Sequence, residues 1–183
     1  MKIARQVKSQ ITKLFKSGKT VDAIMLAVAD DFPRITASRV NEVVRQHLFE
    51  QADELWSIAV KIGGRCEISG KTYNLEAHHL IKRDNLAYRW DLMNGVCLNS
   101  FHHKDAHVDE ETFFLWLKEC KPVRWGWYGI YKDFGGLIQQ VNNDYLLQTC
   151  KDIKHFIERR RHENSDYQEI GKRKRVITET DAV

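Results

Sequence analysis

The chain has 183 residues, a hydrophobic fraction of 43% and a net charge of +4. This length suits one or two small domains with a buried core, and the composition is that of a globular protein. No apolar run is long enough to span a membrane, which argues against a membrane protein. The first residues lack the apolar segment of a secretory signal. The four cysteines are scattered, so we expect them reduced in a cytoplasm.

Residues 1–62 are predicted to form three helices. The first carries apolar residues at helical spacing, namely Ile3, Val7, Ile11, Leu14 and Phe15. Thr20 and Thr36 stand where N-caps of a second and a third helix are expected, and Pro33 disfavours helix just before it. Because no Pro or Gly occurs between Thr36 and Ile62, the third helix can run on to Gly63-Gly64.

Two interpretations of this helical module remain open. A short helix, a turn and a basic-faced helix form the layout of a helix-turn-helix, in which Arg39 and Arg45 could reach DNA. The alternative is a plain helical bundle whose charged residues face water. A third helix that runs on to Ile62 weakens the first interpretation.

The central segment, residues 63–120, is predicted to hold two short strands followed by helices. A strand is expected at Tyr73–His78, a long loop at Leu80–Met93 and a second strand at Val96–Leu98, after the turn signal Asn94-Gly95. Helices are expected at Ser100–Val108 and Asp109–Cys120. His103 and His107 then share one face of the first of these helices, because they are four residues apart.

This segment gathers metal-capable side chains: the pair His78-His79, then Asn94, then His103 and His107. Each histidine alone would more often be structural or a plain surface residue. Together, with Asn94 between them, they resemble the HNH endonuclease family, whose core has a ββα-metal shape. The resemblance covers about 45 residues. The run RWDLMNGVCL followed by a His-rich helix is also similar to HNH proteins carried by bacteriophages.

The resemblance implies a role for each of these residues. His78, His103 and His107 match the ligands of one divalent ion, such as Mg²⁺, Mn²⁺, Ni²⁺ or Zn²⁺. His79 matches the general base. Asn94 matches the residue that orients the base and its loop, and it could fix the tautomer of His79 by hydrogen bonding. A metal ion can neutralise the charge that develops during phosphodiester hydrolysis, and a neutral imidazole can take a proton from the attacking water.

The segment departs from the family at a second metal site. Many HNH proteins hold a structural zinc with two Cys-x-x-Cys pairs that flank the hairpin. Here only Cys66 of the first pair is a cysteine, and the positions matching the second pair are Asn99 and His102. Because amides and hydroxyls bind zinc poorly, we expect no structural zinc.

The loop after the histidine pair carries three cations, Lys82, Arg83 and Arg89. They could hold phosphate groups next to the site of chemistry. The alternative is a solvated loop, and the sequence does not decide between the two.

The last segment, residues 121–183, begins with an aromatic and basic stretch. Its aromatic residues are Trp125, Trp127, Tyr128 and Tyr131. Their rings could stack on bases, but we favour packing of these rings against the nuclease core. A helix is expected from Leu137 to His162. A flexible basic tail containing Lys172-Arg173-Lys174-Arg175 should follow and add non-specific affinity for phosphate.

The sequence therefore predicts a mostly helical α+β protein, with a ββα-metal core between helical N-terminal and C-terminal extensions. The resemblance implies a metal-dependent endonuclease that nicks or cuts DNA, in the cytoplasm of a bacterial host if a phage encodes it. A homodimer would suit a double-strand break. Two alternatives are a DNA-binding regulator with an inactive nuclease-like domain and a structural zinc protein that acts as an interaction module.

Overall fold

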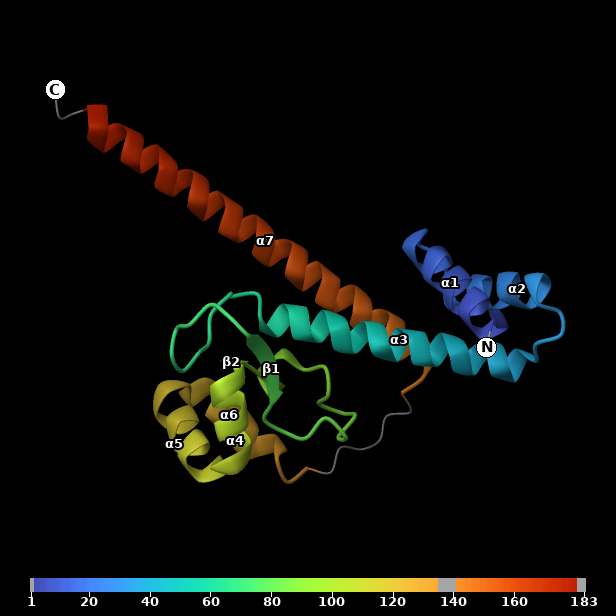
Figure 1. Cartoon of the computed structure of the whole chain (residues 1–183), viewed down its shortest axis with the longest axis horizontal. Coiled ribbons are helices and arrows are strands. Elements are labelled where there is room, and N and C mark those ends of the chain that lie inside the picture. Colours follow the sequence, from blue (N-terminus) through green and yellow to red (C-terminus); the bar gives the residue numbers. More distant parts are fainter. Residues whose placement is uncertain (1, 135–140, 181–183) are drawn as a thin grey trace.

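The computed structural model describes the backbone of residues 2–134 and 141–180, and the surroundings of the side chains of residues 5–134 and 141–163. The described chain is mostly helical and contains one two-stranded antiparallel sheet, in agreement with the expected α+β class (Figure 1). Its elements are α1 (Lys2–Lys16), α2 (Val21–Asp31), α3 (Ala37–Val60), β1 (Leu75–His79), the 3-10 turn η1 (Leu92–Asn94), β2 (Gly95–Asn99), α4 (Ser100–Val108), α5 (Glu110–Cys120), α6 (Pro122–Tyr131) and α7 (Asn143–Thr180).

Helices α2 and α3 begin where the sequence predicts. The hydroxyl of Thr20 accepts the backbone N–H of Ala23, and that of Thr36 accepts the N–H of Arg39, each at 3.3 Å. Each bond satisfies one of the N–H groups that a helix N-terminus leaves without a partner. Helix α3 then runs unbroken for 24 residues. It is therefore long enough to reach from the N-terminal helices to the sheet (Figure 1).

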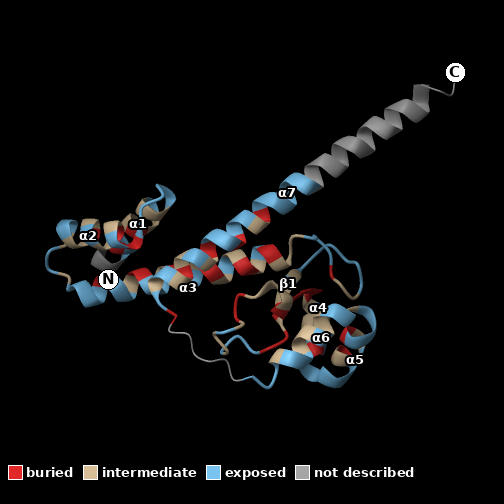
Figure 2. Ribbon diagram, turned by 180° about the vertical axis from the view of Figure 1, so that it is seen from behind, coloured by how far each residue is buried: buried red, intermediate tan, exposed pale blue. Residues whose placement is uncertain are grey.

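The buried side chains form two clusters. The larger one joins α1, α2 and α3 with the first part of α7, which lies side by side with α3 (Figures 1 and 2). The smaller one lies between the hairpin, α4, α5 and α6; its buried members are Cys66, Leu80, Val96, Leu98, Ala106, Phe113 and Leu117. The segment 121–183 is thus divided, with α6 on the smaller cluster and α7 on the larger one.

Several expected boundaries are wrong. Strand β1 begins at Leu75 instead of Tyr73, directly after Asn74, whose φ of 50° is incompatible with a strand. The aromatic stretch, for which no element was predicted, forms helix α6, and Pro122 is tolerated in its first turn because a proline there needs no N–H partner. Helix α7 begins at Asn143 and continues to Thr180, so the tail is helical up to that residue. The predicted helix start at Leu137 lies outside the described residues.

Helix α3 packs closely against the start of β2. A Cβ atom placed on Gly95 would overlap the Val60 side chain and lie 2.9 Å from the Trp56 ring. Trp56 is 3% exposed, and its indole N–H donates to the carbonyl of Asp91 at 2.9 Å. Glycine at position 95 is therefore what allows α3 to approach the hairpin.

The substitution Gly95→Ala should lower the free energy of unfolding by about 1–3 kcal/mol, because the new methyl group must displace Trp56 or Val60. Urea denaturation measures this loss. Gly126→Ala is the matched control, because a Cβ there meets nothing within 4 Å and alanine favours a helix. Equal effects of the two substitutions would contradict the close approach.

A half-buried carboxylate joins the hairpin to α6. Glu67 lies in the turn before β1, and its carboxylate accepts hydrogen bonds from Lys121 at 2.8 Å, from Arg124 at 2.9 Å and from the backbone N–H of Cys97 at 3.0 Å. Burial alone would raise the pKa of Glu67, but the hydrogen bond from Lys121 and the charge of Arg124 outweigh it and lower the pKa below its ordinary value. The ionised carboxylate therefore stabilises the fold.

Glu67→Gln should lower the free energy of unfolding by about 2 kcal/mol at pH 7, as expected for lost hydrogen bonds to charged partners. Because the pKa is lower in the folded state, this contribution is present above about pH 4.3 and is lost as the pH falls through the folded-state pKa. Denaturation of both proteins at pH 7 and at pH 3 should show the difference shrinking. Glu54→Gln, at an exposed position of α3, should change stability little at either pH.

Candidate metal centre

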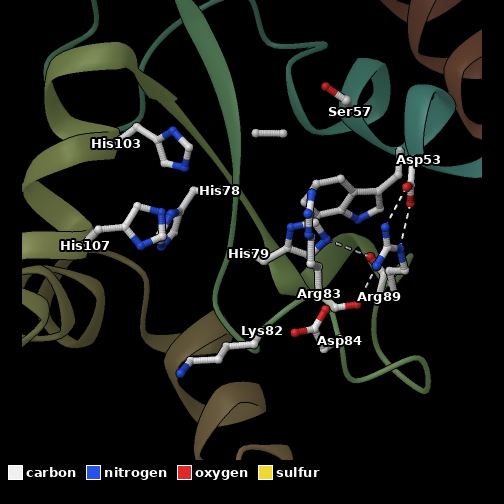
Figure 3. Close-up of a pocket in the computed structure, with 12 residues that line it drawn as sticks. Asp53, Ser57, His78, His79, Lys82, Arg83, Asp84, Arg89, His103 and His107 are labelled. Atoms are coloured by element: carbon white, nitrogen blue, oxygen red, sulfur yellow. Dashed lines mark hydrogen bonds and ion pairs between the residues drawn. The ribbon is translucent and has the colours of Figure 1, made fainter. Parts of the chain in front are cut away.

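The alternation of β1 sends the two adjacent histidines to opposite sides. His78 points toward α4, where His103 and His107 lie one turn apart, and His79 points the other way, toward α3 (Figure 3). One nitrogen from each of His78, His103 and His107 lies within 4.8 Å of the other two. Their ring centroids are 4.8–5.0 Å apart. The predicted ligand set is therefore assembled in the structure.

The surroundings of these rings suit a metal ion. His78 is 5% exposed, and its Nδ1 atom is buried without a hydrogen-bond partner among the described residues. Burial and the nearby His103 and His107 lower the pKa of His78 to about 3, so the ring stays neutral, as a metal ligand must be. Three imidazoles form a donor set that binds divalent ions such as Zn²⁺ or Ni²⁺.

A carboxylate behind this cluster orients one of its rings. Glu76, on the other side of β1 from Ala77, contacts Nδ1 of His103. The carboxylate accepts a hydrogen bond from Nδ1–H of the imidazole, which leaves Nε2 of His103 as the free ligand atom. This carboxylate–histidine arrangement is the usual support of a metal-binding histidine.

His79 is held on both its face and its edge. Its ring stacks on the indole of Trp56, with centroids 3.8 Å apart and an interplanar angle of 14°. Its Nε2 lies 3.0 Å from the carbonyl oxygen of Arg89. Because a carbonyl only accepts, Nε2 carries the proton and Nδ1 keeps the free lone pair. Burial lowers the pKa of His79, which favours the neutral, basic ring at pH 7.

Asn94 supports the loop, and the described hydrogen bonds of its side chain do not include His79. Its side chain is fully buried and accepts from the N–H of Ile81 at 2.6 Å, while its amide donates to the carbonyls of Ile81 and Tyr88. The expectation that Asn94 fixes the tautomer of His79 is wrong, because the carbonyl of Arg89 holds that ring. Asn94 acts indirectly, because its hydrogen bonds to Ile81 and Tyr88 hold the loop that carries the Arg89 carbonyl.

The three loop cations have different surroundings. Arg89 is 8% exposed and binds Asp53 of α3 through two hydrogen bonds of 2.8 and 2.6 Å, and a third nitrogen donates to the carbonyl of Arg83. Its guanidinium is thus occupied, and we assign it to the support of the loop instead of to phosphate. Lys82 and Arg83 are exposed, and both line a cavity of about 540 Å³ that also contacts all four histidines (Figure 3).

Arg39 and Arg45 lie elsewhere. Both are exposed on the first half of α3, and Arg39 pairs with Glu42 at 2.5 Å. With a rise of 1.5 Å per residue, they stand roughly 25 and 16 Å along the helix from Trp56. The structure does not bring them to the cavity, so any contact they make with DNA is separate from the histidine site.

The three positions considered for a second, structural zinc lie in other surroundings. The side chain of Asn99 accepts the N–H of His102 at 3.0 Å and caps α4. The ring of His102 lies near Asp105, with its Nδ1 3.7 Å from that carboxylate. Cys66 is buried in the smaller cluster.

Sequence reasoning missed three residues of the site: Asp53, Trp56 and Glu76. Asp53 and Trp56 belong to the N-terminal helical segment, and Trp56 has the spacing of an ordinary core residue. Only Glu76 had a local signal in the sequence. It stands two residues before His78, so the two side chains point to the same side of a strand.

Comparison of the chain with family models, curated proteins and solved structures finds no match. The site is therefore interpreted from its own geometry. Among the described residues, no helix combines the length and the apolar composition needed to cross a membrane.

The cluster should bind one divalent ion per chain. Calorimetric titration with Zn²⁺ or Ni²⁺ should give a single site that His107→Ala weakens strongly, because one of three ligands is lost. Glu76→Gln should weaken it by about 10- to 100-fold, because the ring of His103 loses its orienting carboxylate. His102→Ala, on the same helix but outside the cluster, is the control, and an equal loss in that variant would contradict the assignment.

Proposed function

We propose that this protein is a metal-dependent endonuclease of the HNH, or ββα-metal, kind that hydrolyses phosphodiester bonds of DNA. The observation that carries the proposal is the arrangement around β1. A three-imidazole cluster lies on one side, the stacked His79 lies on the other, and one cavity contacts both, together with Lys82 and Arg83. The order of β1, β2 and α4 supports the same conclusion, because it is the order of a ββα-metal core.

In this proposal, the chain's own residues carry out binding and proton transfer. Lys82 and Arg83 hold the phosphates of the substrate strand. His79 takes a proton from the attacking water through Nδ1, and the water oxygen forms a bond to phosphorus as the bond between phosphorus and the 3′ oxygen breaks. The leaving 3′ oxygen takes a proton from solvent water, so the products are a 5′ phosphate and a 3′ hydroxyl. A divalent ion bound by His78, His103 and His107 supplies charge neutralisation at the phosphate and the leaving oxygen.

The surroundings of His79 suit a general base. The carbonyl of Arg89 fixes the tautomer and can stabilise the imidazolium that forms, as a fixed acceptor dipole does without reorganisation. The indole face of Trp56 also favours a cation above it. The ion pair of Arg89 with Asp53 keeps the carbonyl in place.

A DNA-binding regulator with an inactive nuclease-like domain is the second candidate. The observation that favours it is the pair of exposed arginines, Arg39 and Arg45, on the helix that follows a short α2 and a turn. This candidate predicts tight, sequence-specific DNA binding without metal-dependent cleavage. The cleavage assay below therefore separates the two.

Supercoiled plasmid should be nicked or linearised by the wild-type chain with Mg²⁺, Mn²⁺ or Ni²⁺ and not with EDTA. His79→Ala should lower the rate by about 10²- to 10⁴-fold, the usual contribution of a general base. It should also still bind the metal ion, because His79 lies outside the ligand cluster. Agarose gels follow the reaction, and calorimetry checks the metal.

The matched control for this assay is His102→Ala, which removes a histidine of α4 that does not belong to the cluster. It should cut as the wild type does. Undiminished cleavage by His79→Ala would overturn the role of the base. A lack of cleavage with every metal, together with a retained gel shift, would favour the regulator.

A further inference from the structure

The candidate metal centre is flanked by two cavities. One is the 540 Å³ cavity toward α3, and the other, of about 380 Å³, lies against α5 and α6. Both are lined by His78, His79, Lys82 and His107. If the reacting phosphate of a DNA strand lies at these shared residues, one neighbouring nucleotide of that DNA strand lies at the second cavity.

The second cavity has an aromatic wall. Phe114 of α5 and Tyr128 of α6 stack with ring centroids 4.6 Å apart and an interplanar angle of 19°. Both rings are half-buried, so part of this stack faces the cavity and the rest packs on the smaller cluster. An aromatic ring that lines a cavity can stack on any nucleobase, because every base has a π-face.

The charges of this cavity match the rest of a nucleotide. Lys82 and Lys132 are exposed, and the ammonium of Lys132 lies 6.0 Å from the centroid of the Tyr128 ring. Glu110 also lines the cavity, and its carboxylate can accept from a base amino group but repels phosphate. The phosphates would then follow the two lysines, with the base edge toward Glu110.

We propose that the second cavity binds one unpaired nucleotide next to the phosphate that is cleaved, so the preferred substrate is single-stranded or locally unpaired DNA. In a duplex, both faces of each base are stacked and its edge is paired. A base can reach the aromatic wall only when it has left the stack. This inference rests on the proposed nuclease function, because that function places the reacting phosphate at the histidines.

Binding is measured with the full chain in EDTA, so that no cleavage occurs. The probes are a labelled DNA single strand, the fully paired duplex of the same sequence, and that duplex with one unpaired nucleotide. Anisotropy should give tighter binding of the single strand and of the interrupted duplex. A 2-aminopurine base in the single strand should be quenched by the wild type, as stacking on Tyr128 requires.

Tyr128→Leu should weaken single-strand binding by about tenfold and abolish the quenching, since one stacked base is lost. Tyr128→Phe should retain both, because it keeps the ring. The matched control is Tyr73→Leu, since Tyr73 is 57% exposed, also has a lysine over its ring, and lines neither cavity. Thermal unfolding of each variant checks that it is folded.

Lys132→Ala provides a second test that does not touch the packed rings. It should weaken single-strand binding several-fold and reduce its salt dependence by about one phosphate contact, whereas Lys71→Ala should do neither. Equal binding of all three DNAs, with no effect of either cavity substitution, would overturn the inference. If the inference is overturned in this way but the wild-type protein still nicks plasmid only with a metal ion, the nuclease function stands. If the wild type neither cuts nor binds any DNA, the nuclease function itself fails.

Discussion

The packing of α3 on the hairpin is the contact on which the rest of the site depends. Trp56 lies between Gly95 and His79: it fills the space left by a glycine without a Cβ, and it forms the flat surface on which the imidazole stacks. One helical turn earlier, Asp53 binds both Arg89 and the indole of Trp90. A helix that begins among the N-terminal helices thus fixes both the ring and the hydrogen-bond acceptor of the candidate base.

A short strand separates two kinds of chemistry that need different surroundings. His78 faces α4 and is buried enough to remain neutral, as its candidate role of ligand requires, whereas its neighbour His79 faces α3 and keeps one nitrogen free of the cluster. Because adjacent residues of a strand point to opposite sides, two consecutive histidines can serve separate roles without competing for one ion. Both still reach the same cavity, because the strand ends at His79.

The hairpin is held from several directions by polar contacts as well as by packing. Asn94 closes the loop between the strands, Glu67 joins the hairpin to α6, and Asn99 caps α4 directly after β2. Each of these side chains is largely buried and makes at least one hydrogen bond across elements or to a helix end, which favours a single arrangement over alternatives. The exposed cations Lys82 and Arg83 make no such contact through their side chains among the described interactions, which leaves them available to a ligand.

The sequence by itself determined the local features: the caps Thr20 and Thr36, the helix Ser100–Val108 and the shared face of His103 and His107, because caps and helical spacing act over a few residues. The addition of His78 to this pair followed only from the family resemblance. Periodicity also predicted the α+β class. The tertiary structure alone decided which distant residues meet. In the folded chain, Trp56 stacks on His79, Arg89 forms an ion pair with Asp53, and α7 packs beside α3. Such pairings depend on how whole elements pack and leave no local pattern in the sequence. For the same reason, the partner of His79 proved to be a backbone carbonyl, which no side-chain motif encodes.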